Sequence, residues 1–211
     1  MKRIFIIVLA TLLTLGACKD KNSYIAPVDF SLLLPDSNEI SNGITQDQRQ
    51  SRTKSFILSI RENTINHKIP DVTVFDLNGT PQSLEKYLSN TSLIISSSLT
   101  CAWNLDGLLN DFPKANQQIS NPINDKEIIL LIQREDNDYF KKQFDEYIQE
   151  IKDNYSNIFL IDSLMSLRLN LFGLSRYYLS KEHVVIDIGL GTGLNIDLLK
   201  EELWRNTIAI K

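Results

Sequence analysis

The side chain with the clearest chemical potential is the thiol of Cys101. It follows an apolar stretch at 92–96, typical of a buried strand, and it precedes a helix predicted at 103–119. A cysteine at the amino end of a helix feels the positive end of the helix dipole, which favours the nucleophilic thiolate over the thiol. This placement makes Cys101 a candidate catalytic nucleophile for thiol chemistry.

A dithiol mechanism would need a second cysteine three positions after Cys101, and that position is Asn104. Three interpretations of Cys101 therefore stay open. It is a small buried apolar side chain, a nucleophile that depends on an external thiol, or a site of modification or metal capture. The two histidines, His67 and His183, are isolated in the sequence and form no zinc-ligand cluster. We expect no metal and no cofactor.

The other cysteine, Cys18, ends a stretch with the pattern of a secretory signal. Positive charge at Lys2 and Arg3 precedes an apolar run at 4–13, which is too short to cross a ~30 Å bilayer core as a helix. Small residues follow in Leu15-Gly16-Ala17-Cys18, which resembles the lipobox of bacterial lipoproteins.

The lipobox resemblance implies that residues 1–17 are a lipoprotein signal peptide and that Cys18 becomes the acylated first residue of the mature chain. The alternatives are an ordinary signal peptide with an incidental cysteine, or an uncleaved anchor. The implied location is the bacterial cell envelope, outside the cytoplasm, with membrane lipid as the partner of Cys18. Two or three acyl chains hold a protein stably on a membrane, whereas one does so only marginally.

Composition limits the functions that the rest of the chain could have. The 211 residues carry 22 Lys and Arg against 26 Asp and Glu, and removal of Lys2 and Arg3 would shift the formal net charge from −4 to −6. This acidic balance argues against nucleic acid as a partner. Acylation of Cys18 would leave Cys101 as the single free thiol, so an internal disulfide could not form.

The chain divides into segments of different character. We expect a polar tether at 18–50, in which the apolar patch 30–34 could dock on a domain, and a linking helix at 51–68. A regular alternation of strands and helices follows from residue 69 to 211, which predicts an α/β fold with a largely parallel sheet. The predicted strands are 72–77, 92–96, 127–132, 157–161 and 183–188, and the predicted helices are 83–88, 103–119 with a kink at Pro113, 138–153, 164–172 and 196–204.

The segment 69–104 resembles the opening of exported thioredoxin-like domains of the thiol-reductase and peroxiredoxin kind. A Pro70-Asp71 strand start, an Asn78-Gly79 turn and a Ser83-Leu84 helix start lead to a buried strand and a cysteine-bearing turn. The resemblance covers about residues 69–205. It implies a thioredoxin-like three-layer fold, with a central mixed sheet flanked by helices, and a thiol or protein partner for Cys101.

The sequence also departs from this resemblance around the cysteine. Peroxiredoxin chemistry would need a proline where Ile94 stands, although Ser98 could fill the hydroxyl position and Arg168 or Arg176 could approach the thiolate. The proline that such domains place before the last hairpin is missing from residues 175–182. The active site is therefore degenerate by comparison with that family.

The stretch from Val185 to Gly193 resembles the glycine-rich cofactor motif of S-adenosylmethionine-dependent methyltransferases. In that family the motif opens the domain, whereas only residues 194–211 follow it here, too few to complete a cofactor pocket. We therefore reject a methyltransferase and interpret Gly189-Leu190-Gly191 as a hairpin turn. Two hypotheses stay open: a one-cysteine thiol oxidoreductase or peroxidase, and a redox-inactive thioredoxin-like binding or scaffold module.

Overall fold

A seven-stranded sheet forms the centre of the molecule. The computed structural model describes residues 23–34, 43–99, 102–118, 122–134, 138–171, 174–179 and 181–191. The strand order is β2-β1-β5-β4-β3-β6-β7. β3, β4 and β5 are parallel to one another, and the other strands are antiparallel to their neighbours, so the sheet is mixed. The strands are β1 Thr73–Phe75, β2 Pro81–Ser83, β3 Ser92–Ser97, β4 Ile128–Gln133, β5 Ile158–Ile161, β6 Leu174–Leu179 and β7 Val185–Gly191.

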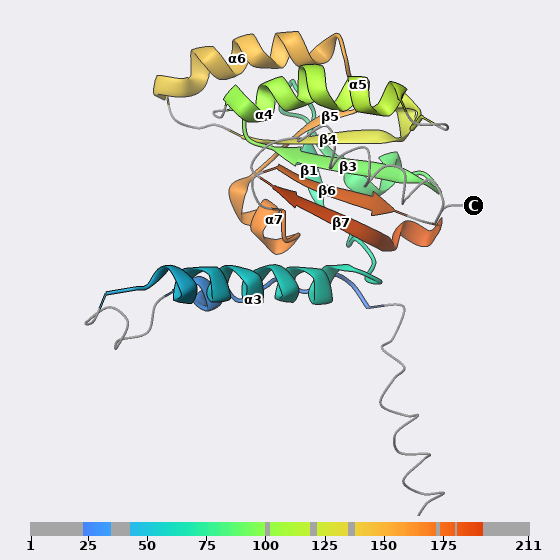
Figure 1. Cartoon of the computed structure of the whole chain (residues 1–211). Coiled ribbons are helices and arrows are strands. Elements are labelled where there is room, and N and C mark those ends of the chain that lie inside the picture. Colours follow the sequence, from blue (N-terminus) through green and yellow to red (C-terminus); the bar gives the residue numbers. More distant parts are fainter. Residues whose placement is uncertain are drawn as a thin grey trace, which may run out of the picture.

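Helices cover both faces of this sheet, which gives three layers (Figure 1). α4 Ala102–Asp106, α5 Phe112–Gln117 and α6 Asp138–Lys152 lie on one face. α7 Ser163–Arg168 and the longer α3 Gln46–Thr64 lie on the other. Short 3-10 turns are η1 Phe30–Leu33, η2 Leu84–Tyr87, η4 Asp125–Glu127 and η5 Lys181–His183. The predicted α/β class is confirmed.

The two faces of the sheet bury separate apolar clusters. Leu93 and Ile95 of β3 pack with α5 and α6, while Ile94 packs on the opposite side with α3. Both sides of β3 and β4 are buried, which explains why these strands appear in the sequence as continuous apolar runs.

The helix predicted at 103–119 contains a π-helical turn, η3 Gly107–Asp111, between α4 and α5. The amide of Phe112 donates to the Gly107 carbonyl, five residues back. The residue five positions after Leu108 is Pro113, which has no N–H to donate. The Tyr155 hydroxyl instead donates to the Leu108 carbonyl at 2.6 Å. The predicted disturbance at Pro113 is therefore a widened turn that a tyrosine completes.

The last two described strands differ from the prediction. The sequence does not predict β6. Gly189-Leu190-Gly191 belongs to β7, where Gly189 pairs with Arg176, so the predicted glycine hairpin turn is wrong. The connection between the strands includes η5, in which Glu182 and His183 have φ values of 68° and 60°. A turn made by residues other than Gly or Asn carries little sequence signal, which explains the error. The helix predicted at 196–204 lies outside the described residues.

The N-terminal segment 23–34 is packed against the domain. Ile25 and Val28 are buried in the cluster that also holds Phe56 and Ile60 of α3. α3 begins five residues before the expected linking helix, because Thr45 and Gln48 form a capping box. The segment 23–28 thus departs from the expected tether, since Ile25 and Val28 are part of the apolar core.

Asn170 holds this segment in place. Its Oδ1 accepts from the Val28 amide at 2.9 Å, and its Nδ2 donates to the Ala26 carbonyl at 2.9 Å and to Thr64 Oγ1 at 3.1 Å. Asn170 has a φ of 55°, in the left-handed region. This conformation ends α7 four residues before the predicted end of that helix.

Candidate functional site

The turn that carries Cys101 joins the centre of the sheet to the α4–α5 helix. Cys101 and Cys18 both lie outside the described residues. β3 ends at Ser97, the buried Leu99 follows, and α4 begins at Ala102. The cysteine position is thus confined to the short connection between a buried strand and the amino end of a helix.

This turn lies at the end of the sheet where the parallel strands β3, β4 and β5 have their carboxyl ends. β3 is flanked by the parallel β4 and the antiparallel β6, so the amino end of β6 lies beside the carboxyl end of β3. In open α/β sheets the carboxyl ends of parallel strands commonly form the ligand-binding edge. A reactive side chain in this turn would therefore lie where neighbouring strand ends can supply further contacts.

Asn104 braces the turn from within the helix. Its side chain is 4% exposed, and its Nδ2 donates to the Ser98 carbonyl at 3.2 Å. Its Oδ1 is buried and has no hydrogen-bond partner within the part of the chain that the structure describes. Asn104, which stands three positions after Cys101, thus holds the turn, and its Oδ1 is an acceptor without a partner among the described residues.

The serines before the turn have different surroundings. Ser98 is half-buried, and its carbonyl accepts from Asn104 and from Ser97 Oγ, the latter at 3.5 Å. Ser96 is fully buried, and among the described residues its Oγ has no partner. Ser96 is a polar group within the sheet that sequence reasoning did not single out.

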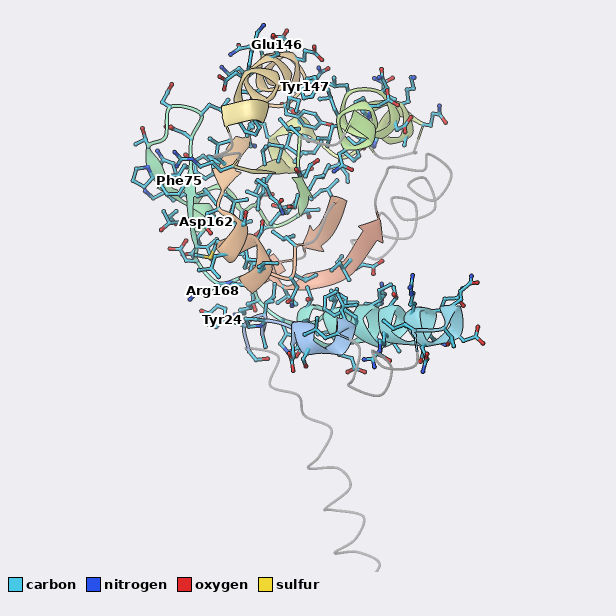
Figure 2. The ribbon with its side chains drawn as sticks, turned by 90° about the vertical axis from the view of Figure 1, so that its left-hand side faces the viewer. Tyr24, Phe75, Glu146, Tyr147, Asp162 and Arg168 are labelled. Atoms are coloured by element: carbon cyan, nitrogen blue, oxygen red, sulfur yellow. The ribbon has the colours of Figure 1, made fainter. Side chains whose placement is uncertain are left out.

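The residues that correspond to the proline and the arginine of a peroxiredoxin site are spread over the fold. Ile94 is a core residue, 1% exposed, and pairs with Tyr177 across the β3–β6 ladder. Arg168 is exposed in the last turn of α7, in the layer opposite α4 (Figures 1 and 2). Arg176 has its backbone in register with Ile95, on the strand beside β3. The structure therefore places Arg176, by its backbone, nearer to the strand that leads to the turn.

The two histidines of the chain lie beside the amino end of β7, at the opposite end of the sheet from the carboxyl end of β3. The Val185 amide donates to the His67 carbonyl at 2.9 Å, and the Ile69 amide donates to the His183 carbonyl at 3.2 Å. β7 is parallel to β3, because both are antiparallel to β6, so the amino end of β7 is far from the carboxyl end of β3. The structure therefore places both histidines near the amino end of β7, at the opposite end of the sheet from the point where β3 leads into the α4–α5 helix.

No protein-family model matches the chain, and no curated protein matches its sequence. Among solved structures it is similar to a thioredoxin-like protein from Bacteroides caccae, with 17% identity and a TM-score of 0.47 over 78% of this chain. The chain spans 57% of the length of that protein. It is also similar to a secreted Mycobacterium tuberculosis disulfide oxidoreductase homologous to E. coli DsbE, with 11% identity and a TM-score of 0.43, over 63% of this chain and 94% of that one. A thiol peroxidase from Chromobacterium violaceum is similar as well, with 14% identity and a TM-score of 0.43, over 66% of this chain and 86% of that one.

The elements after β3 run in the order α4–α5, β4, α6, β5, α7, β6 and β7 around a mixed sheet. This is the alternation that the sequence resemblance implies, with β6 added. The fold is thioredoxin-like.

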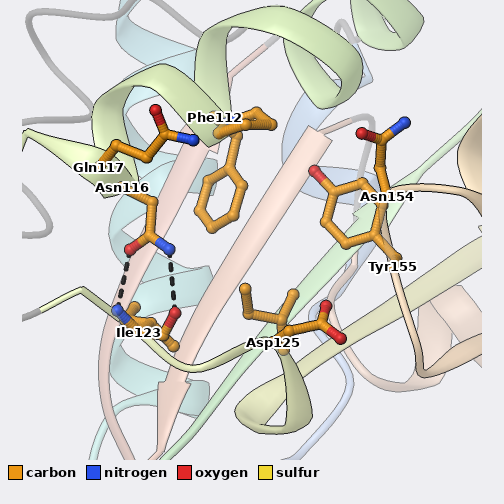
Figure 3. Close-up of a pocket in the computed structure, with 9 residues that line it drawn as sticks. Phe112, Asn116, Gln117, Ile123, Asp125, Asn154 and Tyr155 are labelled. Atoms are coloured by element: carbon orange, nitrogen blue, oxygen red, sulfur yellow. Dashed lines mark hydrogen bonds between the residues drawn. The ribbon is translucent and has the colours of Figure 1, made fainter.

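A cavity of about 180 Å³ lies near the amino end of β4, beside Phe112 and Tyr155 (Figure 3). The Asn116 side chain is occupied by hydrogen bonds to the backbone N and O of Ile123, both at 2.9 Å. Burial, with a smaller effect of the Asp125 charge, raises the pKa of Tyr155, so its hydroxyl stays a neutral donor to Leu108. Ligand pockets usually measure ~300–1,000 Å³. We interpret this smaller cavity as a packing crevice around the π-helical turn.

Within the described ranges, no group of three or more His, Cys, Asp or Glu side chains is gathered as a metal site would require. No helix in those ranges is both long enough and apolar enough to cross a bilayer.

Proposed function

We propose that this protein is a lipid-anchored cell-envelope protein whose thioredoxin-like domain uses Cys101 as its single reactive thiol. The observation that carries the proposal is the position of Cys101 between the central strand β3 and the start of the α4–α5 helix. Asn104 supports this placement, because its bond to the Ser98 carbonyl holds the strand end against the helix. The helix dipole would lower the pKa of a thiol at this end and favour its thiolate.

The reaction that one cysteine allows is thiol–disulfide exchange with an external partner. The thiolate attacks one sulfur of a substrate disulfide, a mixed disulfide forms, and the other sulfur leaves as a thiolate. An external thiol then attacks the mixed disulfide and restores Cys101. With a peroxide, the thiolate would displace an alcohol and become a sulfenic acid, which an external thiol condenses to a disulfide with loss of water.

The reactivity of Cys101 is tested by its rate of alkylation against pH in the folded mature chain. We expect a pKa below the ~8.5 of an ordinary cysteine, because the thiolate lies at a helix amino end. The same chain in denaturant should titrate near the ordinary value, and Cys101→Ser should abolish both alkylation and thiol-dependent disulfide or peroxide reduction. A folded protein whose thiol does not react would show that Cys101 is a buried apolar residue.

The anchor is tested by the mass of the mature protein from membranes of a bacterial host that expresses the full 211-residue chain. We expect a chain that starts at Cys18 and carries a diacylglycerol on sulfur and a fatty acid on its amino group. Cys18→Ser should remove the lipid, while Cys101→Ser, the matched cysteine variant, should leave it intact. Recovery of an unlipidated Cys18 would contradict the anchor.

A redox-inactive binding module is the second candidate function. It is favoured by Asn104, because a buried amide occupies the position of a resolving thiol and already has a structural role. Ile94, a core residue, stands where a peroxiredoxin would need proline. This candidate predicts that Cys101→Ser preserves the cellular role of the protein, whereas the thiol proposal predicts its loss.

A further inference from the structure

The exposed apolar side chains of the molecule are concentrated at one end. Seven large apolar side chains are exposed in the described part of the chain, and five belong to the N-terminal segment and α3. In Figures 1 and 2 these two elements lie at the end of the molecule opposite α6, with Tyr24 at its margin. We call this end the α3 surface; its exposed apolar side chains are Tyr24, Leu33, Leu34, Ile57 and Leu58.

The amino-terminal half of α3 buries few side chains against the domain and so gains little stability from this packing. The side chains of residues 46–55 are exposed or half-buried, and the buried residues of α3 are Phe56, Ile60 and Thr64. Leu34, the residue after η1, is joined to this half of α3 by a hydrogen bond from Arg52 Nη1 to its carbonyl at 2.6 Å. Helices gain most of their stability from packing of an apolar face. An outer layer that covers the α3 surface would complete that packing.

The α3 surface combines apolar side chains with cations. A shallow hollow of about 400 Å³ on α3 is lined by Arg49, Lys54, Ile57 and Leu58, with Gln50 and Thr53 between them. A surface that places basic side chains beside exposed aliphatic ones suits the interface of an anionic bilayer, where the aliphatic groups enter the acyl boundary.

The start of the described chain brings this surface close to the anchor. Ser23 is held in place, because its carbonyl accepts from the Lys68 amide at 2.9 Å. Cys18 lies five residues before Ser23, and five extended residues reach at most ~18 Å. Lipid on Cys18 would therefore keep the α3 surface within a short distance of the membrane.

We propose that the α3 surface rests on an anionic phospholipid bilayer and so orients the thioredoxin-like domain on the membrane. This inference rests on the proposed anchor at Cys18. The anchor would supply proximity, and the α3 surface would supply the orientation, with α6 pointing away from the lipid. Tyr24 suits the same interface, because aromatic side chains with a polar tip favour the headgroup level.

The test is co-sedimentation of the mature chain, unacylated through Cys18→Ser, with vesicles of phosphatidylcholine alone and with added phosphatidylglycerol. We expect binding to the anionic vesicles at low salt. Lys54→Gln should weaken it by about fivefold, since each cation near an anionic surface contributes ~1 kcal/mol. Lys142→Gln removes the same charge from α6, at the opposite end, and should change nothing. Ile57→Ser with Leu58→Ser should weaken binding by about tenfold or more, whereas Leu164→Ser with Leu167→Ser on α7 should not.

The outcomes separate this inference from the proposed anchor. Failure of the unacylated chain to bind anionic vesicles, or equal losses in the α3 and α7 variants, would overturn the inference even if Cys18 is acylated. Binding that depends on Lys54 and Ile57 would support it even if Cys18 carries no lipid. A change of oligomeric state in the Ile57 and Leu58 variant, without a change in vesicle binding, would assign the surface to a second copy of the chain and overturn the proposal.

Discussion

Replacement of Asn170 by alanine is expected to destabilise the protein by about 3–5 kcal/mol in urea denaturation. Asn170 is fully buried, and its side chain makes three hydrogen bonds, to Val28, Ala26 and Thr64. Alanine would leave these three groups without their partner, and an unsatisfied buried polar group costs ~1–3 kcal/mol. Alanine would also occupy the left-handed conformation at a φ of 55°, which adds roughly 1 kcal/mol.

The matched control for this variant is Asn66→Ala. Asn66 has a φ of 66° and so adopts the same left-handed conformation, but its side chain is exposed. We expect it to lose only the conformational part, roughly 1 kcal/mol. The difference in free energy of unfolding between the two variants measures the contribution of the Asn170 hydrogen bonds. Equal destabilisation by both variants would contradict a stabilising role for these hydrogen bonds.

Hydrogen exchange gives an independent readout of what Asn170 holds. The Val28 amide donates to Asn170 Oδ1, and the Ile25 amide donates to the Lys68 carbonyl at 3.0 Å. In Asn170→Ala the amides of residues 23–34 should exchange faster than the amides of β3 and β4, because the segment would open before the sheet. Uniform acceleration over the whole chain would indicate global destabilisation without local release.

Asn104→Cys is expected to convert the one-cysteine turn into a dithiol site. The change places a second thiol three positions after Cys101, one helical turn further along, with Ala102 and Trp103 between the two cysteines. Residues three apart on a helix have Cβ atoms ~5–6 Å apart, so side-chain rotation and a small adjustment would allow a disulfide. The variant would also remove the buried Oδ1 that has no partner among the described residues, which offsets the loss of the bond to Ser98.

The expected result is an internal disulfide, seen as the loss of two hydrogens by mass and of reactivity toward alkylating agents until a reductant is added. Thiol-dependent reduction of insulin should rise by at least about tenfold, because the second thiol resolves the mixed disulfide within the same chain. Asn110→Cys is the matched control. That position is exposed on the same helix and nine residues from Cys101, about 13 Å along the axis, too far for a disulfide. An Asn104→Cys protein that folds but keeps two free thiols under oxidising conditions would contradict the proposed position of Cys101.

Several elements of the fold could be predicted because their signals are local. The sequence predicts a strand at 127–132, and β4 is Ile128–Gln133. It predicts a helix at 138–153, and α6 is Asp138–Lys152. The Asn78-Gly79 turn also forms the hairpin between β1 and β2, with Gly79 at a φ of 81°. Apolar periodicity and turn chemistry act over a few residues, so the sequence alone carries them.

The surroundings of the candidate site could be predicted only in part. The order strand, cysteine turn, helix is visible in the sequence, and so is the absence of a second cysteine at Asn104. The sequence does not show that Asn104 is buried and bonded to the Ser98 carbonyl, or that both histidines lie at the far edge of the sheet. These relations depend on strand order, which long-range pairing decides.

By itself, the sequence determined that Cys101 follows a buried strand, that no cysteine stands three positions later, and that Cys18 ends a lipobox-like stretch. These are properties of residue type and spacing. Only the tertiary structure decided that residues 23–28 pack on the domain through Asn170, and that α3 presents apolar and basic side chains at one end. The physical reason is that such contacts join residues more than 100 positions apart; their geometry exists only after the sheet has brought those segments together.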